Sequence, residues 1–266
     1  MKLYLTGLKS YQLDLGIEYA AFADPRLERT LHGIKRDHNE PGHRQRTPLT
    51  HPHLLLLLSR MSLTDYNDVV LRAAFTLAFA AFLRIGEFTY KRTDIPTGPH
   101  FGSWFLTKSS IRLTEHEGEQ LLELTLPTSK TDPFRHGVEL TIAASNDPGC
   151  PAYAMKRFLR MDTHRPLTAP PFCVGILQQL PFTWEYIVQK LQCLAMGAGL
   201  GHEAWNGHSF RRGAATSAAQ VRIGETQIQR LGRWRSEAYK LYIEYSKEER
   251  IALPQRFQRA PRAQHR

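Results

Sequence analysis

The sequence predicts a mainly helical α+β protein with one small antiparallel β-sheet. Apolar residues recur at helical spacing in segments spread over most of the 266 residues, which is typical of amphipathic or buried helices. Three short runs near the middle of the chain, separated by turn residues, instead favour strands. Hydrophobic residues make up 42% of the chain, so it can bury the core of one large domain, or of a small and a medium-sized one.

The charge of the chain favours a polyanionic partner. The formal net charge is +10, which indicates nucleic acid before a membrane surface, although a basic protein without such a partner can have the same charge. The cysteines Cys150, Cys173 and Cys193 form no C-x-x-C pair, so we expect a reducing compartment and neither a zinc site nor a disulfide framework. The N-terminus has no signal-peptide pattern and no apolar run suits a membrane span, so we expect an intracellular protein.

The first 40 residues predict two helices, too few to hold a core of their own. The first helix ends near Gly16, and the second begins at Pro25. We therefore expect residues 1–40 to be the last part of a helical domain whose beginning is missing. Polar and basic residues follow from Lys35, and residues 41–47 predict a basic linker, which is either an ordinary solvated loop or a strap along a phosphate backbone.

The main domain is predicted over residues 48–250, around one central helix. Residues 68–82 are apolar on nearly every face, so this helix should lie in the core, after a short buried helix at residues 54–58. Polar residues just before it can cap its first turn. The central helix runs into Leu83-Arg84-Ile85-Gly86-Glu87. Two charged residues at the end of the most buried helix have to pair, because an isolated buried charge is costly.

A small sheet is predicted in the middle of this domain. Its strands are expected at residues 104–113, 120–127 and 138–142. The last two strands are joined by a turn that contains Ser129-Lys130-Thr131, so Lys130 should lie at a hairpin tip. The remaining segments are two helices and a basic tail, at residues 152–161, 181–197 and 251–266.

A histidine and an arginine three residues apart, in His208-Ser209-Phe210-Arg211, lie on one face of a predicted helix. Such groups suit phosphate chemistry. When a tyrosine hydroxyl attacks a phosphodiester, guanidinium groups hold the charge that grows on the oxygens, and histidine or indole N–H groups donate further hydrogen bonds. A lysine can protonate the leaving oxygen, and the tyrosine carries the covalent intermediate. Candidates for all these roles are present, namely Arg84, Lys130, His208, Arg211, Trp234 and Tyr242.

Each candidate taken alone has a simpler explanation. Arg84 and Lys130 can be solvated surface cations, and His208 can be a helix-start residue without a task. Trp234 and Tyr242 can belong to the core. The order and spacing of the whole set therefore decide between the two interpretations. With so many cations in the set, we expect no metal ion and no cofactor.

The ordered set resembles the tyrosine recombinases, also called phage-type integrases. Leu83-Arg84-Ile85-Gly86-Glu87 is similar to their first arginine box, with the acidic residue three positions on. Ser129-Lys130-Thr131 looks like the segment of their catalytic lysine. His208-Ser209-Phe210-Arg211 matches their H-x-x-R box, and Leu231-Gly232-Arg233-Trp234 matches the box that holds histidine or tryptophan. The resemblance covers residues 48–246, and residues 208–216 and 232–239 are especially similar to Crypton-type recombinases of fungal transposons.

This resemblance implies an enzyme that cleaves and rejoins DNA strands. The implied catalytic residues are Arg84, Lys130, His208, Arg211, Trp234 and Tyr242, with Glu87 in support. It also implies double-stranded DNA as the partner, self-association into a synaptic tetramer on DNA, and a nuclear location. Residues 1–40 are then similar to the last helices of a DNA core-binding domain.

The nucleophile is the least determined member of the set. The spacing from Trp234 to Tyr242 is slightly shorter than is commonest in the family, and Tyr239, Tyr242 and Tyr245 fall on one short helix after Ser236. Tyr242 fits the Crypton-type pattern best, and Tyr245 is the fallback. Two other functions stay open. One is a truncated or domesticated DNA-binding protein without cleavage activity, and the other is a type IB topoisomerase, whose chemistry is similar.

Overall fold

The computed structural model describes residues 2–18, 20–37, 47–91, 101–128, 132, 134, 136–177, 179–201 and 205–243. The chain divides into two compact units, Met1–Gln45 and Arg46–Arg266. We call them the N-terminal unit and the C-terminal unit and describe each by itself. Within the described ranges, no helix combines the length and the apolar character needed to cross a membrane.

The N-terminal unit consists of α1 (Lys2–Asp14), the short 3-10 helix η1 (Ala20–Ala23) and α2 (Pro25–Asp37). The chain leaves α1 through Gly16, whose φ of 67° is a conformation that glycine adopts without strain. α2 begins at Pro25, and the Asp24 carboxylate accepts a hydrogen bond from the Arg26 backbone N–H at 2.8 Å. Both helices, the stop near Gly16 and the start at Pro25 are confirmed.

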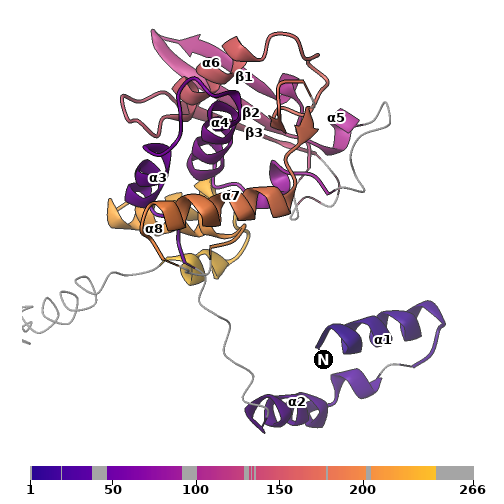
Figure 1. Cartoon of the computed structure of the whole chain (residues 1–266). Helices are drawn as coiled ribbons and strands as arrows, with labels where there is room; N and C mark the ends of the chain where they lie inside the picture. Colours follow the sequence, from indigo (N-terminus) through magenta and orange to yellow (C-terminus); the bar gives the residue numbers. More distant parts are fainter. Residues whose placement is uncertain are drawn as a thin grey trace, which may run out of the picture. The chain divides into compact units, whose positions relative to one another are not determined.

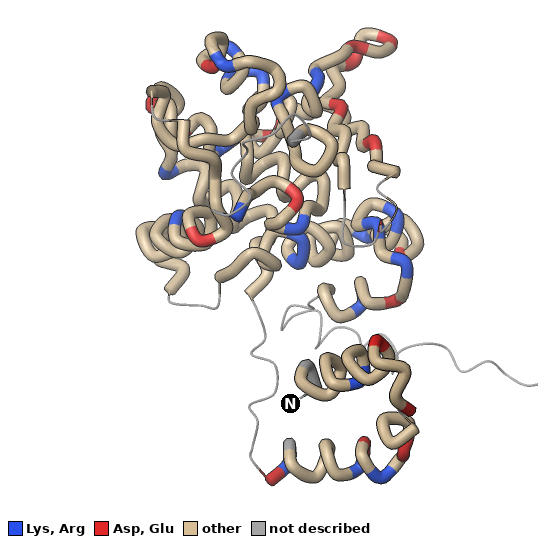
Figure 2. The backbone as a smooth tube through the Cα atoms, turned by 90° about the vertical axis from the view of Figure 1, so that its right-hand side faces the viewer, with Lys and Arg blue, Asp and Glu red and all other residues tan. Residues whose placement is uncertain are grey.

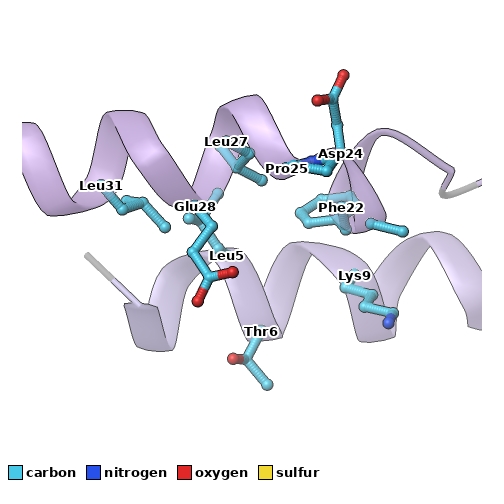
Figure 3. Close-up of a pocket in the computed structure, with 10 residues that line it drawn as sticks. Leu5, Thr6, Lys9, Phe22, Asp24, Pro25, Leu27, Glu28 and Leu31 are labelled. Carbon is cyan, nitrogen blue, oxygen red and sulfur yellow. The ribbon is translucent and has the colours of Figure 1, made fainter.

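A pocket of about 350 Å³ lies between α1 and the segment formed by η1 and α2. The side chains of Leu5, Phe22 and Leu27 point toward the space between the helices (Figure 3). Tyr4 and Tyr11 of α1 are 81% and 62% exposed. Two helices of this length bury little apolar surface between them, as expected for so small a unit.

The C-terminal unit is built around α4 (Tyr66–Ala80), which lies in its middle (Figure 1). Ten of the fifteen residues of α4 are buried, and the Asp65 carboxylate caps the helix by accepting from the Asp68 backbone N–H at 3.0 Å. The prediction of a central buried helix is confirmed. The packed helices around α4 are α3 (His51–Leu58), α6 (Pro151–Met161) and α8 (Ser209–Gln220), and α7 (Trp184–Gly197) also belongs to this unit.

The sheet has the strand order β1-β2-β3, with both pairs antiparallel. Its strands are β1 (Ile111–His116), β2 (Glu119–Leu126) and β3 (Val138–Ala143). Leu122, Leu124 and Leu126 alternate along β2 and are all buried, so one face of the sheet packs on the core, where β2 contacts α6. The prediction of one small antiparallel sheet is confirmed.

Two predicted boundaries are wrong. Residues 104–110 are not a strand: α5 (Phe101–Trp104) and η4 (Lys108–Ser110) occupy that stretch. The hydroxyl of Thr107 bonds the hydroxyls of both serines of η4 there, and such local side-chain bonds compete with strand pairing. The helix expected from residue 181 begins at Trp184, because Leu180–Pro181 forms β5, which pairs with β4 (Cys173–Val174).

A buried ionic network joins the start of the sheet to the end of α6. The ammonium of Lys108 lies 3.0 Å from Asp162 Oδ2 and donates to the Asp162 and Arg165 carbonyls at 2.7 and 2.9 Å. Arg165 donates to both Asp162 carboxylate oxygens and to the thiol sulfur of Cys173. Burial raises the pKa of the Cys173 thiol to about 11. No sequence pattern predicts this network, which fixes the chain just before β1.

Candidate active site

The end of α4 turns the chain so that two charged side chains follow the most buried helix. Phe82 takes a left-handed conformation with φ 51°, and the short helix η2 (Ile85–Glu87) follows at once. A left-handed residue other than glycine costs about 1 kcal/mol, so the surrounding packing has to fix this turn. Arg84 precedes η2 in an extended conformation, with φ −76° and ψ 146°. The turn thereby places Arg84 beside Glu87.

Glu87 is the carboxylate of the site, and its side chain is only 5% exposed. Its Oε1 accepts a hydrogen bond from Nη1 of Arg84 at 2.9 Å. Its Oε2 accepts from the Arg84 backbone N–H at 2.9 Å and from Nη2 of Arg233 at 2.8 Å. The expectation that charges at the end of the central helix are paired is confirmed. One carboxylate is shared by two guanidinium groups, so it cannot neutralise both of them.

Arg211 comes from α8 and is 1% exposed. α8 packs against α4, and Arg211 Nη1 donates to the Phe82 carbonyl at 2.8 Å while Nη2 donates to the Gly232 carbonyl. The guanidinium carbon lies 4.3 Å from the ring centroid of Trp234, which is a close cation–π contact. Nε of Arg211 is buried and makes no hydrogen bond among the residues that the structure describes.

Among the residues that the structure describes, the site contains more positive than negative charge. Burial lowers the pKa of Arg211 to about 9; the charges of Arg84 and Arg233 act in the same direction, and Glu87 and Tyr242 oppose them. Burial also lowers the pKa of Arg233. Lys and Arg occur at many other places along the tube of both units (Figure 2). In this cluster the guanidinium groups of Arg84, Arg211 and Arg233 lie near one another and near Glu87. An anion bound here would supply the missing negative charge.

Trp234 and Tyr242 follow α9 (Glu225–Leu231) across a turn that requires glycine. A Cβ at Gly232 would overlap the indole ring of Trp234, so the ring lies directly on the backbone of the turn. The short helix η5 (Glu237–Tyr242) then brings Tyr242 to Trp234, with 5.5 Å between the ring centroids. The Tyr242 carbonyl accepts a hydrogen bond from Thr216 Oγ1 at 3.0 Å, which holds the end of η5 on α8.

His208 lies just before α8 and beside the same tyrosine. The ring centroids of His208 and Tyr242 are 6.5 Å apart. A Cβ at the preceding residue, Gly207, would come within 2.5 Å of Cγ2 of Ile85. The chain that leads into the H-x-x-R segment therefore packs directly on η2, next to Arg84.

The environment distinguishes two of the three candidate tyrosines. Tyr239 is 4% exposed, and its hydroxyl donates to the Glu225 carboxylate at 2.9 Å. Tyr242 is partly exposed and lies against Trp234 and His208. Ser236 caps η5 by accepting a hydrogen bond from the Ala238 backbone N–H. Tyr245 lies outside the described residues.

The structure thus brings together all but one of the residues expected to be catalytic. The clustered residues are Arg84, His208, Arg211, Trp234 and Tyr242, with Glu87 among them. Lys130 lies outside the described residues, between β2 and β3. No sequence pattern predicts the contacts of Arg233, although the residue stands inside a recognised motif. Its φ of 57° and its ion pair with Glu87 are visible only in the structure.

No protein-family model and no curated protein sequence matches the chain. Solved structures match it in fold. The XerH site-specific recombinase bound to palindromic difH substrate, a post-cleavage complex, has a TM-score of 0.55 and 14% identity over 82% of this chain and 54% of that chain. The XerH pre-cleavage complex with difH substrate has a TM-score of 0.50 and 13% identity over 79% of this chain and 54% of that chain.

The XerA recombinase has a TM-score of 0.52 and 14% identity over 97% of this chain and 74% of that chain. The chain spans about half the length of the XerH chains that it matches. At such low identity these likenesses concern the fold and not the roles of residues. With its helices packed around α4 and its three-stranded antiparallel sheet, the chain has the mainly helical α+β fold of the tyrosine recombinase catalytic domain.

Proposed function

We propose that the protein cleaves and rejoins DNA strands through a 3′-phosphotyrosine intermediate at Tyr242. The observation that carries this proposal is the cluster of Arg84, Arg211 and Tyr242 at one place with an excess of positive charge. Guanidinium groups bind phosphate through paired hydrogen bonds and stabilise the charge that grows during phosphoryl transfer. The recombinase fold of the chain supports the same function.

In the proposed reaction the Tyr242 oxygen attacks the scissile phosphorus. A tyrosyl O–P bond forms and the bond from phosphorus to the 5′ oxygen breaks. The phenolic proton passes from Tyr242 to solvent water, and Lys130 gives a proton to the departing 5′ oxygen. Attack by a 5′ hydroxyl on the phosphotyrosine then rejoins a strand and releases the tyrosine.

The remaining residues of the cluster bind the reacting phosphate in this proposal. Arg84 and Arg211 hold the non-bridging oxygens, and His208 and Trp234 donate further hydrogen bonds to them. Glu87 supports the site by holding Arg84. The reaction as proposed requires no metal ion or cofactor, because the cations of the chain itself offset the growing negative charge.

The proposed partner is double-stranded DNA, bound by copies of the chain that assemble into a synaptic tetramer. The matched XerH chains are bound to difH substrates, which supports a role in site-specific recombination. We further propose that residues 1–40 belong to a DNA core-binding domain, joined through the basic linker at residues 41–47 to the catalytic domain at residues 48–250. The residues around His208 and Trp234 favour a Crypton-type transposon recombinase, which implies a nuclear location.

Covalent capture on nicked DNA tests the proposal. The labelled duplexes have a randomised centre, because the target sequence is unknown. They also have a nick beside the centre, so that the short 5′-hydroxyl product diffuses away after cleavage and the covalent adduct accumulates. We expect label that stays on the wild-type protein under denaturing conditions, is lost in Tyr242→Phe and is retained in the matched variant Tyr239→Phe.

Two results would replace the proposal by one of its alternatives. Salt-dependent DNA binding without any adduct would indicate a binding protein that does not cleave. Relaxation of supercoiled plasmid by the protein alone would indicate a type IB topoisomerase.

A further inference from the structure

Arg233 is a buried arginine in a backbone conformation that arginine rarely adopts. Its φ is 57°, and its side chain is 11% exposed. A left-handed backbone and a buried charge are each unfavourable when taken alone. The contacts of the side chain therefore have to offset both.

Those contacts join the two ends of the turn that carries Arg84. Nη1 of Arg233 donates to the Ala81 carbonyl at 2.8 Å, just past the end of α4. Nη2 donates to Oε2 of Glu87 at 2.8 Å, at the end of η2. Residues 81–87 are thus held between two hydrogen bonds from one guanidinium group, whose planar donors suit this geometry.

Glu87 connects Arg233 to Arg84, because its carboxylate accepts hydrogen bonds from both residues. The carboxylate that receives Arg233 also accepts from the backbone N–H and from Nη1 of Arg84, both at 2.9 Å. Arg84 is therefore fixed in both its backbone and its side chain. Because Glu87 is shared with Arg233, it leaves part of the charge of Arg84 for another anion.

The same turn also contacts the second arginine of the site. The carbonyl of Gly232 accepts a hydrogen bond from Arg211, and the Trp234 ring lies over the Arg211 guanidinium. The segment Gly232-Arg233-Trp234 therefore reaches both Arg84 and Arg211, one through Glu87 and the other directly.

We infer that Arg233 is a positioning residue of the phosphate site, which aims Arg84 at the bound phosphate through Glu87 and prevents Glu87 from neutralising Arg84. The inference rests on the proposed function, and it adds a residue and a role to it. Nη1 and Nη2 of Arg233 each donate to a protein acceptor, and the role inferred for Arg233 acts through Arg84.

The test compares two arginines whose backbone has a left-handed conformation, Arg222 and Arg233. Arg222 follows α8 with φ 63° and is exposed, so Arg222→Gly and Arg233→Gly relieve the same backbone strain. Only the second variant loses the contacts to Ala81 and Glu87. Arg233→Gln and Arg233→Lys keep a long side chain at the site, and they serve if the glycine variant fails to fold.

Two readouts are measured on every variant. The first is the rise in Tm that inorganic phosphate causes relative to chloride at equal ionic strength. The second is the rate of covalent adduct formation at saturating nicked DNA, with the DNA affinity measured separately. We expect Arg222→Gly to match the wild type in both. Arg233→Gly and Arg233→Gln should lose most of the phosphate effect and slow adduct formation by about tenfold or more with little change in DNA affinity, because Arg84 is misplaced.

Arg233→Lys should recover part of the rate of adduct formation, since one ammonium keeps the charge but cannot reach both acceptors.

Arg233→Gln and Arg233→Gly variants that match the wild type in both readouts would overturn the inference, as would a folded wild type that phosphate does not stabilise. A wild type that forms no adduct refutes the proposed function instead. In that case the phosphate effect alone decides the role of Arg233: its loss in Arg233→Gln supports the inference, and its retention overturns it.

Discussion

Arg211 lies under the indole ring of Trp234, with 4.3 Å between its guanidinium carbon and the ring centroid, and only 1% of the residue is exposed. The indole therefore has two separable functions in the proposed site. Its ring covers and holds a buried cation, and its N–H is available as a hydrogen-bond donor for the phosphate.

Replacing Trp234 separates these functions. Trp234→Phe keeps an aromatic face over Arg211 but has no N–H, so we expect a loss of at most about 1 kcal/mol in the free energy of unfolding and a fall of about a hundredfold in the rate of adduct formation. Trp234→Ala also removes the ring and should cost about 3 kcal/mol. Urea unfolding and the adduct assay check both variants. Equal losses of stability in the two would show that the ring does not hold Arg211.

The pH dependence of phosphate binding should follow the charge of Arg211. Burial lowers its pKa from the ordinary value of an arginine to about 9 in the folded protein, so the unfolded chain binds this proton more tightly. Arg211 therefore opposes folding most strongly below about pH 9, and this opposition shrinks as the pH rises above about 9.

The charged form of Arg211 opposes folding but favours phosphate binding, since only the charged guanidinium attracts an anion. The Tm increase caused by phosphate over chloride should be full below about pH 9 and decline as the pH rises through about 9. Melting curves from about pH 7 to about pH 10.5 measure it. An increase that stays constant over this range would show that Arg211 does not carry the effect.

Close packing of α8 against the chain near Leu49 should depend on Gly213. A Cβ at Gly213 would overlap the Leu49 carbonyl, so Gly213→Ala should lower the free energy of unfolding by about 3 kcal/mol or prevent folding. Gly197 in α7 has open space where a Cβ would be added, so the matched Gly197→Ala should be neutral or stabilise by about 0.5 kcal/mol. Thermal or urea unfolding distinguishes them, and equal effects would contradict the packing of α8.

The buried network around Asp162 should be essential for stability. Lys108→Met leaves the Asp162 carboxylate short of one buried cation, and breaking such a pair costs about 3–5 kcal/mol. As a control, Lys240 is 47% exposed and lies 3.2 Å from Glu237, so Lys240→Met should change the unfolding midpoint little. A Lys108→Met protein with the wild-type midpoint in urea would show that the network adds nothing to stability.

The sequence predicts those features that depend on neighbouring residues. α4 was predictable because its residues are apolar on nearly every face, and its start because Asp65 can cap it. The strand predicted at residues 104–113 is wrong in its first part. There, the Thr107 hydroxyl bonds to η4, and Lys108 reaches Asp162, 54 residues away.

In the candidate site, too, the sequence predicts what depends on neighbouring residues and misses what depends on distant ones. Arg84, His208 and Arg211 stand in short motifs. The structure brings Arg84 near Arg211, and it brings Arg211 and His208 near Tyr242. Arg233 pairs with Glu87 across 146 residues of sequence, and no local pattern records such a partner. A left-handed conformation at an arginine is equally invisible in the sequence, because it is imposed by the contacts of the folded chain.

The most direct test of the central claim is to identify the residue that carries DNA. Trypsin cleaves after Arg235, Lys240 and Lys247, so Tyr239 falls in one peptide, and Tyr242 and Tyr245 fall in the next. After nuclease digestion of the captured adduct, mass spectrometry should find the nucleotide on the peptide of residues 241–247, with fragment ions that place it on Tyr242. A nucleotide on Tyr239 or Tyr245, or no modified tyrosine in an adduct-forming protein, would contradict the assignment of Tyr242 as the nucleophile.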